Sequence, residues 1–347
     1  MSEGSGFYVT TMVSTTAASG GNDQSYPIGF ALFVYITTFV IGVPANILAF
    51  YTFCQKVHRK PTPIDILLLN LTISDLIFLI FLPFKMKEAA DNGIWSLPRF
   101  LCPVTGFLFY STIYNSTLLL TAVSVERYLS VAYPIRFTAP GRIVHTQVAC
   151  VIFWITSLVN CSVVLHMEIR KNASNKYCYS NFTKSELESL HAVRVELFVL
   201  LFCVPLLICI FCYVNFIRIL SRMANIPRTR RTRAIGLALG TLAVFTLCFG
   251  PYNVSHVFGM VDGNIPRWRK HALLLTTFNA CLDPIVFYFS SSAVRSRLNI
   301  CLKSVKTRLK PKATAGQTDN TPKPNESLPS SSQRLGASVM ADTEDTC

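Results

Sequence analysis

Apolar residues gather in seven long runs along this chain, and shorter polar segments separate them. Each run approaches or exceeds the roughly 20 residues that an α-helix needs to cross a bilayer. The third, fifth and seventh runs contain polar groups, so the pattern defines their bounds least well. The runs cover 28–53, 63–86, 100–132, 146–169, 192–220, 233–259 and 271–290. This pattern predicts an all-α membrane protein built as a seven-transmembrane helix bundle.

The segments that flank the bundle, which we place at 28–290, have a different composition. Residues 1–27 are rich in Ser, Thr and Gly and lack a basic start followed by an apolar core. We therefore expect a flexible extracellular N-terminus and no cleaved signal peptide. Residues 291–306 place apolar side chains at helical spacing between basic ones, which predicts a short amphipathic helix on the cytoplasmic membrane surface. Residues 307–347 are polar and rich in Ser, Thr and Pro, so we expect a disordered cytoplasmic tail.

The chain carries a formal net charge of +14, although only 14% of its residues are charged. The basic residues follow the first, third, fifth and seventh spans, which places them on one side of the bundle. They are Lys56, Arg59, Lys60, Arg136, Arg142, Arg218, Arg222, Arg228, Arg230, Arg231, Arg233, Arg295, Arg297, Lys303, Lys306, Arg308 and Lys310. The positive-inside rule makes that side cytoplasmic, with the N-terminus outside and the C-terminus inside. No soluble domain carries the basic residues, so we expect contact with the lipid bilayer and not with nucleic acid.

Most of the twelve cysteines lie inside the spans, and the positions of Cys102, Cys178 and Cys301 each lead to a prediction. Cys102, at the outer end of the third span, and Cys178, in the long outer loop, face an oxidising compartment. A disulfide between them is favoured over two free thiols. Cys301, in the amphipathic segment, is a candidate for palmitoylation, and a plain apolar surface cysteine explains it equally well.

Buried ionisable residues in spans are costly and usually functional. Asp75 and Asp283 are the clearest examples, and with Asn46, Ser116 and Asn279 they predict a polar cluster inside the bundle. Oxygen ligands of this kind suit a small hard cation such as sodium. A hydrogen-bonded structural network without an ion satisfies the same groups equally well. No other cofactor is indicated.

Prolines interrupt five of the spans. Each removes a backbone donor and can kink its helix, and kinked helices can pivot. They are Pro44, Pro83, Pro205, Pro251 and Pro284. So many interruptions indicate a bundle that moves.

The triplet Glu126-Arg127-Tyr128 ends the third span on the cytoplasmic side. The acid can pair with the arginine and hold it in one state, and the released arginine can help form a docking surface. Further residues occupy matching positions in the other spans: Asn46, Asp75, Cys102, Trp154, Pro205, Tyr213, Asp283, Pro284 and Tyr288. With these residues, the chain resembles a rhodopsin-like (class A) G-protein-coupled receptor over roughly 28–305. Two residues depart from the usual family pattern, namely Phe249 in place of tryptophan and Glu126 in place of aspartate.

This resemblance implies partners and a set of activation residues. Phe249 would act as an aromatic toggle beside Pro251, and Tyr213, Pro284 and Tyr288 would take part in coupling to a heterotrimeric G protein. Both the Gi/o and the Gq class remain open. Phosphorylated tail residues such as Ser330, Ser331 and Ser332 would recruit arrestin; a plain solvated tail is the alternative.

A closer resemblance is to the free fatty acid receptors, especially their short-chain branch. It rests on long stretches such as FYSTIYNSTLLL, SVERYLSVAYPI, VRVELF and CFGPYNVSHVFG. The resemblance implies a plasma-membrane receptor for short-chain fatty acids, with a carboxylate bound by Arg194 and Arg269 and assisted by His256. Asn160 and Ser180 depart from the short-chain pattern, in which a histidine and an acid stand at these places, and this puts the preferred chain length in doubt.

Position along the helices is compatible with such a site. At 1.5 Å per residue, Arg194 lies about 16 Å from Pro205, Arg269 about 22 Å from Pro284, and His256 about 8 Å from Pro251, all toward the outer half. A guanidinium matches a carboxylate with two parallel donors. Position alone nevertheless favours ordinary snorkelling of the two arginines at helix ends, and His256 alone would more often be a structural histidine.

Three tyrosines complete the predicted site. Tyr110 and Tyr114 are four residues apart and share a helix face, and with Tyr252 they could bound the acyl chain; simple packing between helices is the alternative. Asn172 and Asn181 begin glycosylation sequons in the outer loop.

Other functions compatible with the same residues are a receptor for a hydroxy acid, dicarboxylate or longer fatty acid, and a carboxylate transporter. No evident internal repeat supports the transporter. A membrane enzyme is the third alternative, and we expect none, since the spans show no metal-spaced His/Cys set and no Ser/His pair.

Overall fold

The computed structural model describes residues 28–134, 141–170, 176–179, 192–223, 226–261, 266 and 268–309. The described elements are α1 (Ile28–Arg59), α2 (Pro63–Ala90), α3 (Leu101–Ala132), α5 (Arg142–Arg170), a helical stretch over 192–198, η1 (Val199–Cys203), α7 (Val204–Arg222), α8 (Arg228–Val261), α9 (Arg269–Thr277), α10 (Asn279–Ser290) and α11 (Ser292–Leu309). The predicted N-terminal segment and nearly all of the tail lie outside the described residues.

Seven crossings match the seven predicted runs. Within the described residues, six helices are long and apolar enough to cross a membrane, the fifth of them running from Ala192 to Arg222 through η1. The seventh crossing is Arg269–Tyr288, which qualifies only together with the segment Ala293–Cys301, bent by 104° from it. Several helices extend past the apolar runs into basic turns, because a membrane-spanning helix can continue into water once its charged side chains reach the headgroups.

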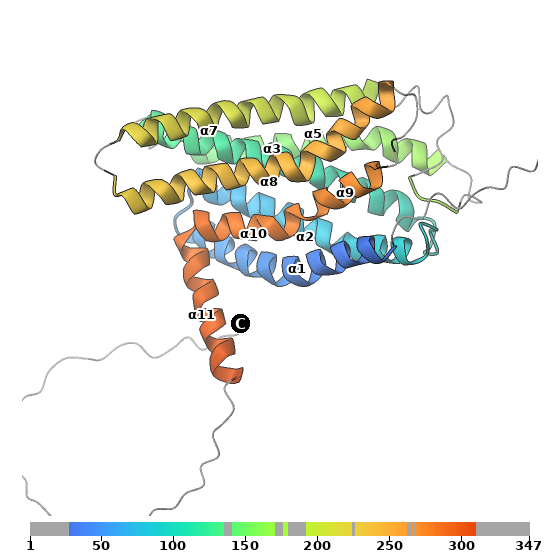
Figure 1. Cartoon of the computed structure of the whole chain (residues 1–347), viewed down its shortest axis with the longest axis horizontal. Helices are drawn as coiled ribbons and strands as arrows, with labels where there is room; N and C mark the ends of the chain where they lie inside the picture. The colour runs from blue at the N-terminus through green and yellow to red at the C-terminus, as the bar shows by residue number, and fades with distance from the viewer. Residues whose placement is uncertain are drawn as a thin grey trace, which may run out of the picture.

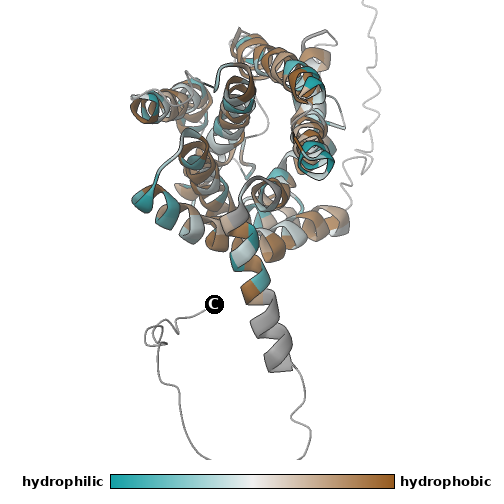
Figure 2. Ribbon diagram, turned by 90° about the vertical axis from the view of Figure 1, so that its left-hand side faces the viewer, coloured by the Kyte–Doolittle hydropathy of each residue, from teal (hydrophilic) through white to brown (hydrophobic). Residues whose placement is uncertain are grey.

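The helices close a ring through α1, α2, α3, α7, α8 and α10, and α3 also contacts α5. Helix α1 packs on α2, α2 on α3, α3 on α5 and α7, and α7 on α8, while α10 contacts both α8 and α1. In Figure 1 the spans lie side by side and α11 leaves them at a steep angle. The end-on view of Figure 2 shows the spans arranged around a common centre, with much of their ribbon brown for hydrophobic residues. Much of α3 is buried, whereas α5 turns most of its apolar residues outward. This arrangement leaves the residues of α3 to face every polar site in the bundle.

The short link between α1 and α2 is fixed by local chemistry. Thr62 caps α2, its side chain accepting a hydrogen bond from the Asp65 backbone N–H at 3.3 Å, and Pro63 follows at the first helical position. Both residues are common there because the first N–H groups of a helix lack partners within it. The Lys56 Nζ to Asp65 Oδ1 ion pair, 2.5 Å, then joins the end of α1 to the start of α2.

The fifth and seventh crossings are not regular helices. The five residues Val199–Cys203 form a π-helical turn directly before Pro205, where the sequence predicts only a proline kink. The Thr117 hydroxyl on α3 donates to the Leu201 carbonyl in that turn at 3.3 Å. The seventh crossing breaks at Phe278, between α9 and α10, and Pro284 lies inside α10. Such breaks are frequent near functional sites.

Candidate functional site

The outer half of the bundle contains a pocket lined by residues from five spans and the outer loop. It holds about 630 Å³ of space, part of it open to solvent. The lining residues are Phe107, Tyr110, Tyr114, Cys161, Val164, Tyr179, Val193, Arg194, Leu197, Tyr252, His256 and Arg269. All six residues predicted to bind the ligand are in this group. Sequence reasoning missed Phe107, Val164 and Tyr179, since a side chain that merely faces inward carries no motif.

Arg269 is held in place by two residues of α8. Its Nη1 lies 3.2 Å from His256 Nδ1, and its Nη2 donates to the Tyr252 hydroxyl at 3.2 Å. The guanidinium carbon also lies 5.0 Å from the centroid of the Tyr252 ring, which is close enough for a cation–π contact. Arg269 is therefore oriented into the pocket. A snorkelling arginine would instead extend toward water.

Arg194 is buried in the same pocket and has no partner among the described residues. Only 6% of Arg194 is exposed, and among the described residues its guanidinium makes no hydrogen bond or ion pair. His256 Nε2 is likewise buried with no partner. Among the described residues that line the pocket, none is acidic. Because a buried charge without a partner is costly, this arrangement suits an anion.

Aromatic rings form one wall of the pocket. The Tyr252 ring lies 5.0 Å from the His256 ring and 6.4 Å from the Tyr110 ring, and the Tyr110 ring lies 5.9 Å from that of Tyr179. Tyr114 is almost fully buried and packs in a small apolar cluster with Cys161, Leu197 and Leu201. The tyrosines thus line the pocket and also pack between helices; that they bound an acyl chain stays a prediction.

Of the two residues that depart from the short-chain pattern, only Asn160 lies in the described part of the chain. Asn160 donates its side-chain amide to the Thr156 carbonyl of its own helix at 2.8 Å and is not a lining residue. Ser180 lies outside the described residues.

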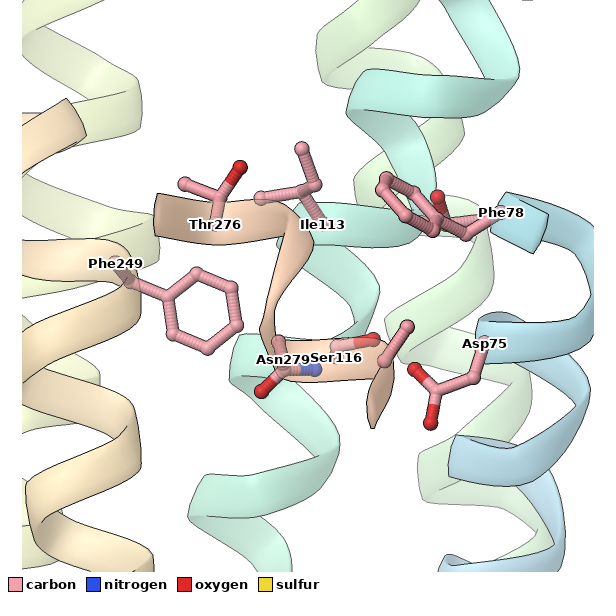
Figure 3. Close-up of a pocket in the computed structure, with 9 residues that line it drawn as sticks. Asp75, Phe78, Ile113, Ser116, Phe249, Thr276 and Asn279 are labelled. Carbon is pink, nitrogen blue, oxygen red and sulfur yellow. The ribbon is translucent and has the colours of Figure 1, made fainter. Parts of the chain in front are cut away.

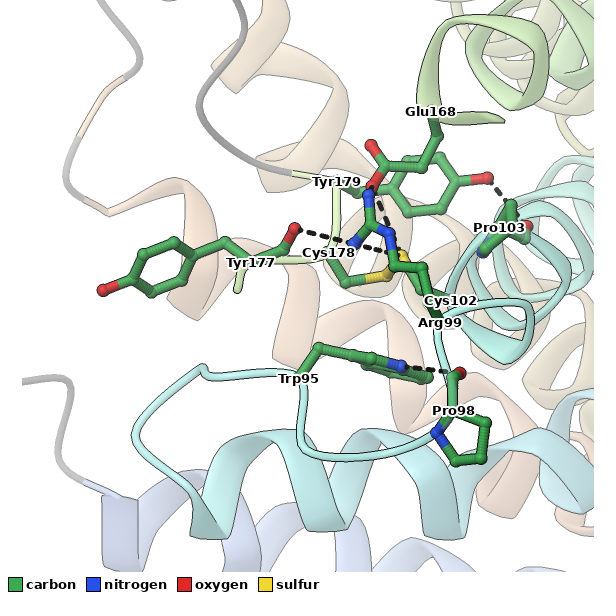
Figure 4. Close-up of polar contacts among 9 residues, drawn as sticks. All are labelled: Trp95, Pro98, Arg99, Cys102, Pro103, Glu168, Tyr177, Cys178 and Tyr179. Carbon is green, nitrogen blue, oxygen red and sulfur yellow. Dashed lines mark hydrogen bonds and ion pairs between the residues drawn. A yellow bond between two sulfur atoms is a disulfide. The ribbon is translucent and has the colours of Figure 1, made fainter. Parts of the chain in front are cut away.

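A disulfide fastens the outer loop over the pocket, as the positions of its cysteines predict. Cys102 and Cys178 are bonded, with their Cα atoms 5.7 Å apart. Arg99 Nη2 pairs with Glu168 Oε1 at 3.1 Å, and Arg99 Nη1 donates to the Tyr177 carbonyl at 3.4 Å (Figure 4). Cys102, Glu168 and Cys178 lie close together, but the disulfide occupies both sulfurs. These three residues therefore stabilise the position of the loop and do not form a metal site.

A second pocket lies deeper in the bundle and is lined by oxygen-bearing side chains. Asp75, Thr112, Ser116, Thr276 and Asn279 line it with Phe78, Ile113, Phe249 and Ala280, around a space of about 210 Å³ (Figure 3). Asn279 Nδ2 donates to Asp283 Oδ2 at 2.8 Å, and Ser116 Oγ donates to Ser74 Oγ at 3.2 Å. Asp283 lies behind this lining, one helical turn from Asn279.

Several oxygens of this inner cluster lack donors. Asp75 Oδ2, Asp283 Oδ1, Asn279 Oδ1 and Asn46 Oδ1 are buried and have no hydrogen-bond partner. The Asn46 amide instead donates to the Gly42 and Ala280 carbonyls, at 3.0 and 2.7 Å, which joins α1 to α10. An unpartnered set of carboxylate and amide oxygens fits a small hard cation.

At the end of the bundle away from the disulfide, Arg127 is bonded to hydroxyls of two other spans. Its Nη1 donates to the Tyr213 hydroxyl at 3.4 Å and to Thr241 Oγ1 at 3.1 Å. Glu126 forms its ion pair with Arg142, at 2.6 Å from Arg142 Nη2. The sequence suggested that Glu126 would hold its neighbour Arg127, but adjacent helical residues point about 100° apart, so the acid meets α5 instead.

The other predicted activation residues take varied places. Tyr128 is half-buried and its ring lies 5.8 Å from that of Phe211. Phe249 is fully buried against Phe245, and it belongs to the inner pocket. Phe287, and not the neighbouring Tyr288, is the fully buried ring, packed edge-on against Phe53 at 5.6 Å. Tyr288 is half-buried, and its role in coupling stays a prediction.

Three predicted modification sites stay predictions. Asn172 and Asn181 lie outside the described residues. Cys301 lies half-buried on α11.

Comparison with known proteins assigns the family. Residues 45–287 match the 7 transmembrane receptor (rhodopsin family). The chain is similar to free fatty acid receptor 3 of Mus musculus, with 48% identity over 75% of this chain and 82% of the relative. It is 45% identical to free fatty acid receptor 3 of Homo sapiens over 82% of this chain and 84% of the relative. It is 44% identical to free fatty acid receptor 2 of Rattus norvegicus over 76% of this chain and 82% of the relative.

These matches are to receptors and support neither the transporter nor the membrane-enzyme alternative. They agree with the resemblance found in the motifs and with the observed bundle. The chain belongs to the rhodopsin family of seven-transmembrane receptors and, within it, to the free fatty acid receptors.

Proposed function

We propose that this receptor is activated by short-chain carboxylates that bind from outside the plasma membrane between Arg194 and Arg269. The observation that carries the proposal is the buried Arg194 guanidinium, which makes no hydrogen bond or ion pair with another described residue and lies in a pocket without a described acid. A carboxylate would accept hydrogen bonds from both guanidiniums, and His256 Nε2 could add a third donor. The names of the relatives support the same ligand class.

The pocket suits a small acid with an apolar tail. Its basic groups lie on α8, α9 and the start of the fifth crossing, while the remaining lining from α3 and α5 is aromatic and aliphatic. A tail placed there leaves water, which favours binding by roughly 0.8 kcal/mol for each buried methylene. This distribution favours a fatty acid over a hydroxy acid or a dicarboxylate, whose second polar group would lack a described charged partner on the apolar side.

Binding would be transmitted to the cytoplasmic face by a shift in the populations of bundle conformations. The ligand can activate only if it binds the active conformation better than the resting one. Arg127, held by Tyr213 and Thr241, is the residue that we assign to the docking site of a heterotrimeric G protein of the Gi/o or Gq class. In this proposal the N-terminus is extracellular, the tail is cytoplasmic, and the phosphorylated tail recruits arrestin.

We also propose that the inner pocket binds a sodium ion. Asp75, Asn279, Ser116 and the adjacent Asp283 would supply the oxygens, and the bound cation would partly neutralise two buried carboxyl groups. The unpartnered oxygens of Asp75, Asp283 and Asn279 support this assignment.

The carboxylate proposal is tested by replacing Arg194. Removing one partner of a buried charge pair typically costs 2–5 kcal/mol, so Arg194→Ala should weaken the potency of propionate at least about 30-fold in a nucleotide-exchange assay. Arg170→Ala, which removes an exposed arginine at the outer end of α5, is the matched control and should leave potency unchanged. Surface expression is measured for both. Full potency of Arg194→Ala at normal surface expression would overturn the proposal.

A further inference from the structure

Tyr179 is the first residue after the disulfide cysteine Cys178, and its side chain enters the helix bundle. Its hydroxyl donates to the Pro103 carbonyl in the first turn of α3 at 2.8 Å (Figure 4). Burial raises the pKa of this hydroxyl above its usual range, so it remains a protonated donor. The neighbouring Tyr177 ring points away from the bundle and is 41% exposed.

The backbone at Tyr179 is set for this inward direction. Its φ is +53°, a conformation that residues other than glycine rarely adopt and that a bulky side chain adopts only when its surroundings impose it. The disulfide at Cys178 fixes the preceding residue to α3, and the hydrogen bond to Pro103 fixes the far end of the ring. Tyr179 is thus attached to α3 at two points, through the disulfide of the preceding residue and through its own hydroxyl.

Gly106 provides the space that the ring occupies. A Cβ atom at Gly106 would overlap the Tyr179 ring, with the Cζ atom of the ring only 2.6 Å away. Any other residue at this position of α3 would force the ring, or the loop that carries it, to move. The close packing of the Tyr179 ring on α3 therefore depends on glycine at position 106.

The pocket places this ring opposite its basic end. Arg269 lies over the Tyr252 ring, Tyr252 stacks near Tyr110, and Tyr110 contacts Tyr179, so Tyr179 stands two ring contacts away from Tyr252. A ligand whose carboxylate is held by the guanidiniums must direct its hydrocarbon tail toward the apolar side. There it meets Phe107, Val164 and Tyr179.

We propose that Tyr179, seated against Gly106, is a specificity-determining residue that sets the upper limit on the acyl chain of the ligand. The inference rests on the proposed carboxylate site and adds the element that closes the apolar end. Shorter acids fit in front of the ring, and longer acids must displace it from its contacts with Gly106 and Pro103.

The test is a chain-length series on the full-length receptor in membranes. Acetate, propionate, butyrate, pentanoate and hexanoate are compared in a nucleotide-exchange assay on the unaltered chain and on Tyr179→Ala. Each methylene that newly enters an apolar site should improve potency about fourfold. The potency of hexanoate relative to propionate should therefore rise more than about tenfold in Tyr179→Ala.

Three further variants distinguish a Tyr179 ring that limits the length of the acyl chain from one that only stabilises the loop. Tyr179→Phe keeps the ring and loses only the hydroxyl, so the hexanoate-to-propionate ratio should stay within about twofold. Gly106→Ala leaves the loop sequence intact but displaces the ring, and should raise the ratio as Tyr179→Ala does. Tyr177→Ala removes a tyrosine of the same loop that does not line the pocket, and should leave the ratio unchanged.

Two outcomes would overturn the inference: an equal loss of potency for all five acids in Tyr179→Ala, or a ratio that does not change. If Gly106→Ala fails to reach the surface, the Tyr179 and Tyr177 variants decide the question by themselves. Failure of the proposed function looks different, because the unaltered receptor would then respond to none of the acids.

Discussion

The outer pocket and the inner pocket occupy the same bundle, but their buried polar groups lack opposite kinds of hydrogen-bond partner. The outer pocket contains donors without acceptors, namely the Arg194 guanidinium and His256 Nε2. The inner pocket contains acceptors without donors, including Asp75 Oδ2 and Asn279 Oδ1. A buried polar group without a partner is costly in either case. The comparison indicates that the charge of each ligand can be inferred from the partners that its pocket lacks.

The two pockets also share their helices. Helix α3 contributes Tyr110 and Tyr114 to the outer pocket and Ser116 to the inner one, and α8 contributes Tyr252 outside and Phe249 inside. Residues so close on one helix cannot shift independently. An anion in the outer pocket and a cation in the inner pocket are therefore expected to influence each other's binding, with equal and reciprocal effects on affinity.

The largest effect should follow from removing Arg269. Arg269→Ala deletes one proposed carboxylate donor and also the guanidinium that bonds His256 and Tyr252, so propionate should lose about 100-fold or more in potency. Arg269→Lys keeps the charge without the two-donor fork and should lose about tenfold. Dose–response curves of nucleotide exchange, normalised to surface expression, measure both. Equal potency of the alanine variant and the unaltered receptor would show that the outer pocket does not require both arginines.

An intermediate effect should follow from neutralising the inner pocket. If Asp75 binds sodium, basal nucleotide exchange should differ about fivefold between sodium and choline at constant ionic strength, within the usual range of coupling between sites. Asp75→Asn should abolish this difference while carboxylate potency remains dependent on Arg194. The sodium assignment would be lost if the variant kept the full sodium dependence.

The smallest effect should come from the Tyr252 hydroxyl. Tyr252→Phe removes the acceptor of the 3.2 Å bond from Arg269 Nη2 but keeps the ring beneath the guanidinium. The loss of one ordinary hydrogen bond should reduce propionate potency about threefold to tenfold. Tyr114→Phe, which alters a lining tyrosine that makes no described bond to Arg269, is the matched control. A larger loss in Tyr114→Phe than in Tyr252→Phe would show that Tyr252 does not orient the arginine.

Much of the fold was predictable because membrane-spanning helices depend on composition along the chain. The seven runs, the positions of Cys102 and Cys178, and the depth of Arg194, Arg269 and His256 all follow from length, hydropathy and 1.5 Å of rise per residue. In the sequence, however, a snorkelling arginine and a buried one look the same. The structure distinguishes them, because Arg269 bonds to two residues of α8.

Other features could not be inferred from the pattern. The π turn at Val199–Cys203 changes the helical repeat between Arg194 and Pro205, so the direction of the arginine cannot be obtained from a regular helix. Glu126 pairs with Arg142 because the start of α5 comes close to the end of α3, and Phe287 is buried in place of Tyr288 because α10 turns that face inward.

The sequence by itself determined the number of crossings and which residues lie at which depth, because these properties depend on distance along each helix. Only the tertiary structure decided which donors remain unpaired and which ring closes the pocket. Those outcomes depend on how side chains from separate helices and the outer loop meet. The contact between Tyr179 and Gly106, 73 positions apart in the sequence, arises only once the disulfide holds the loop against α3.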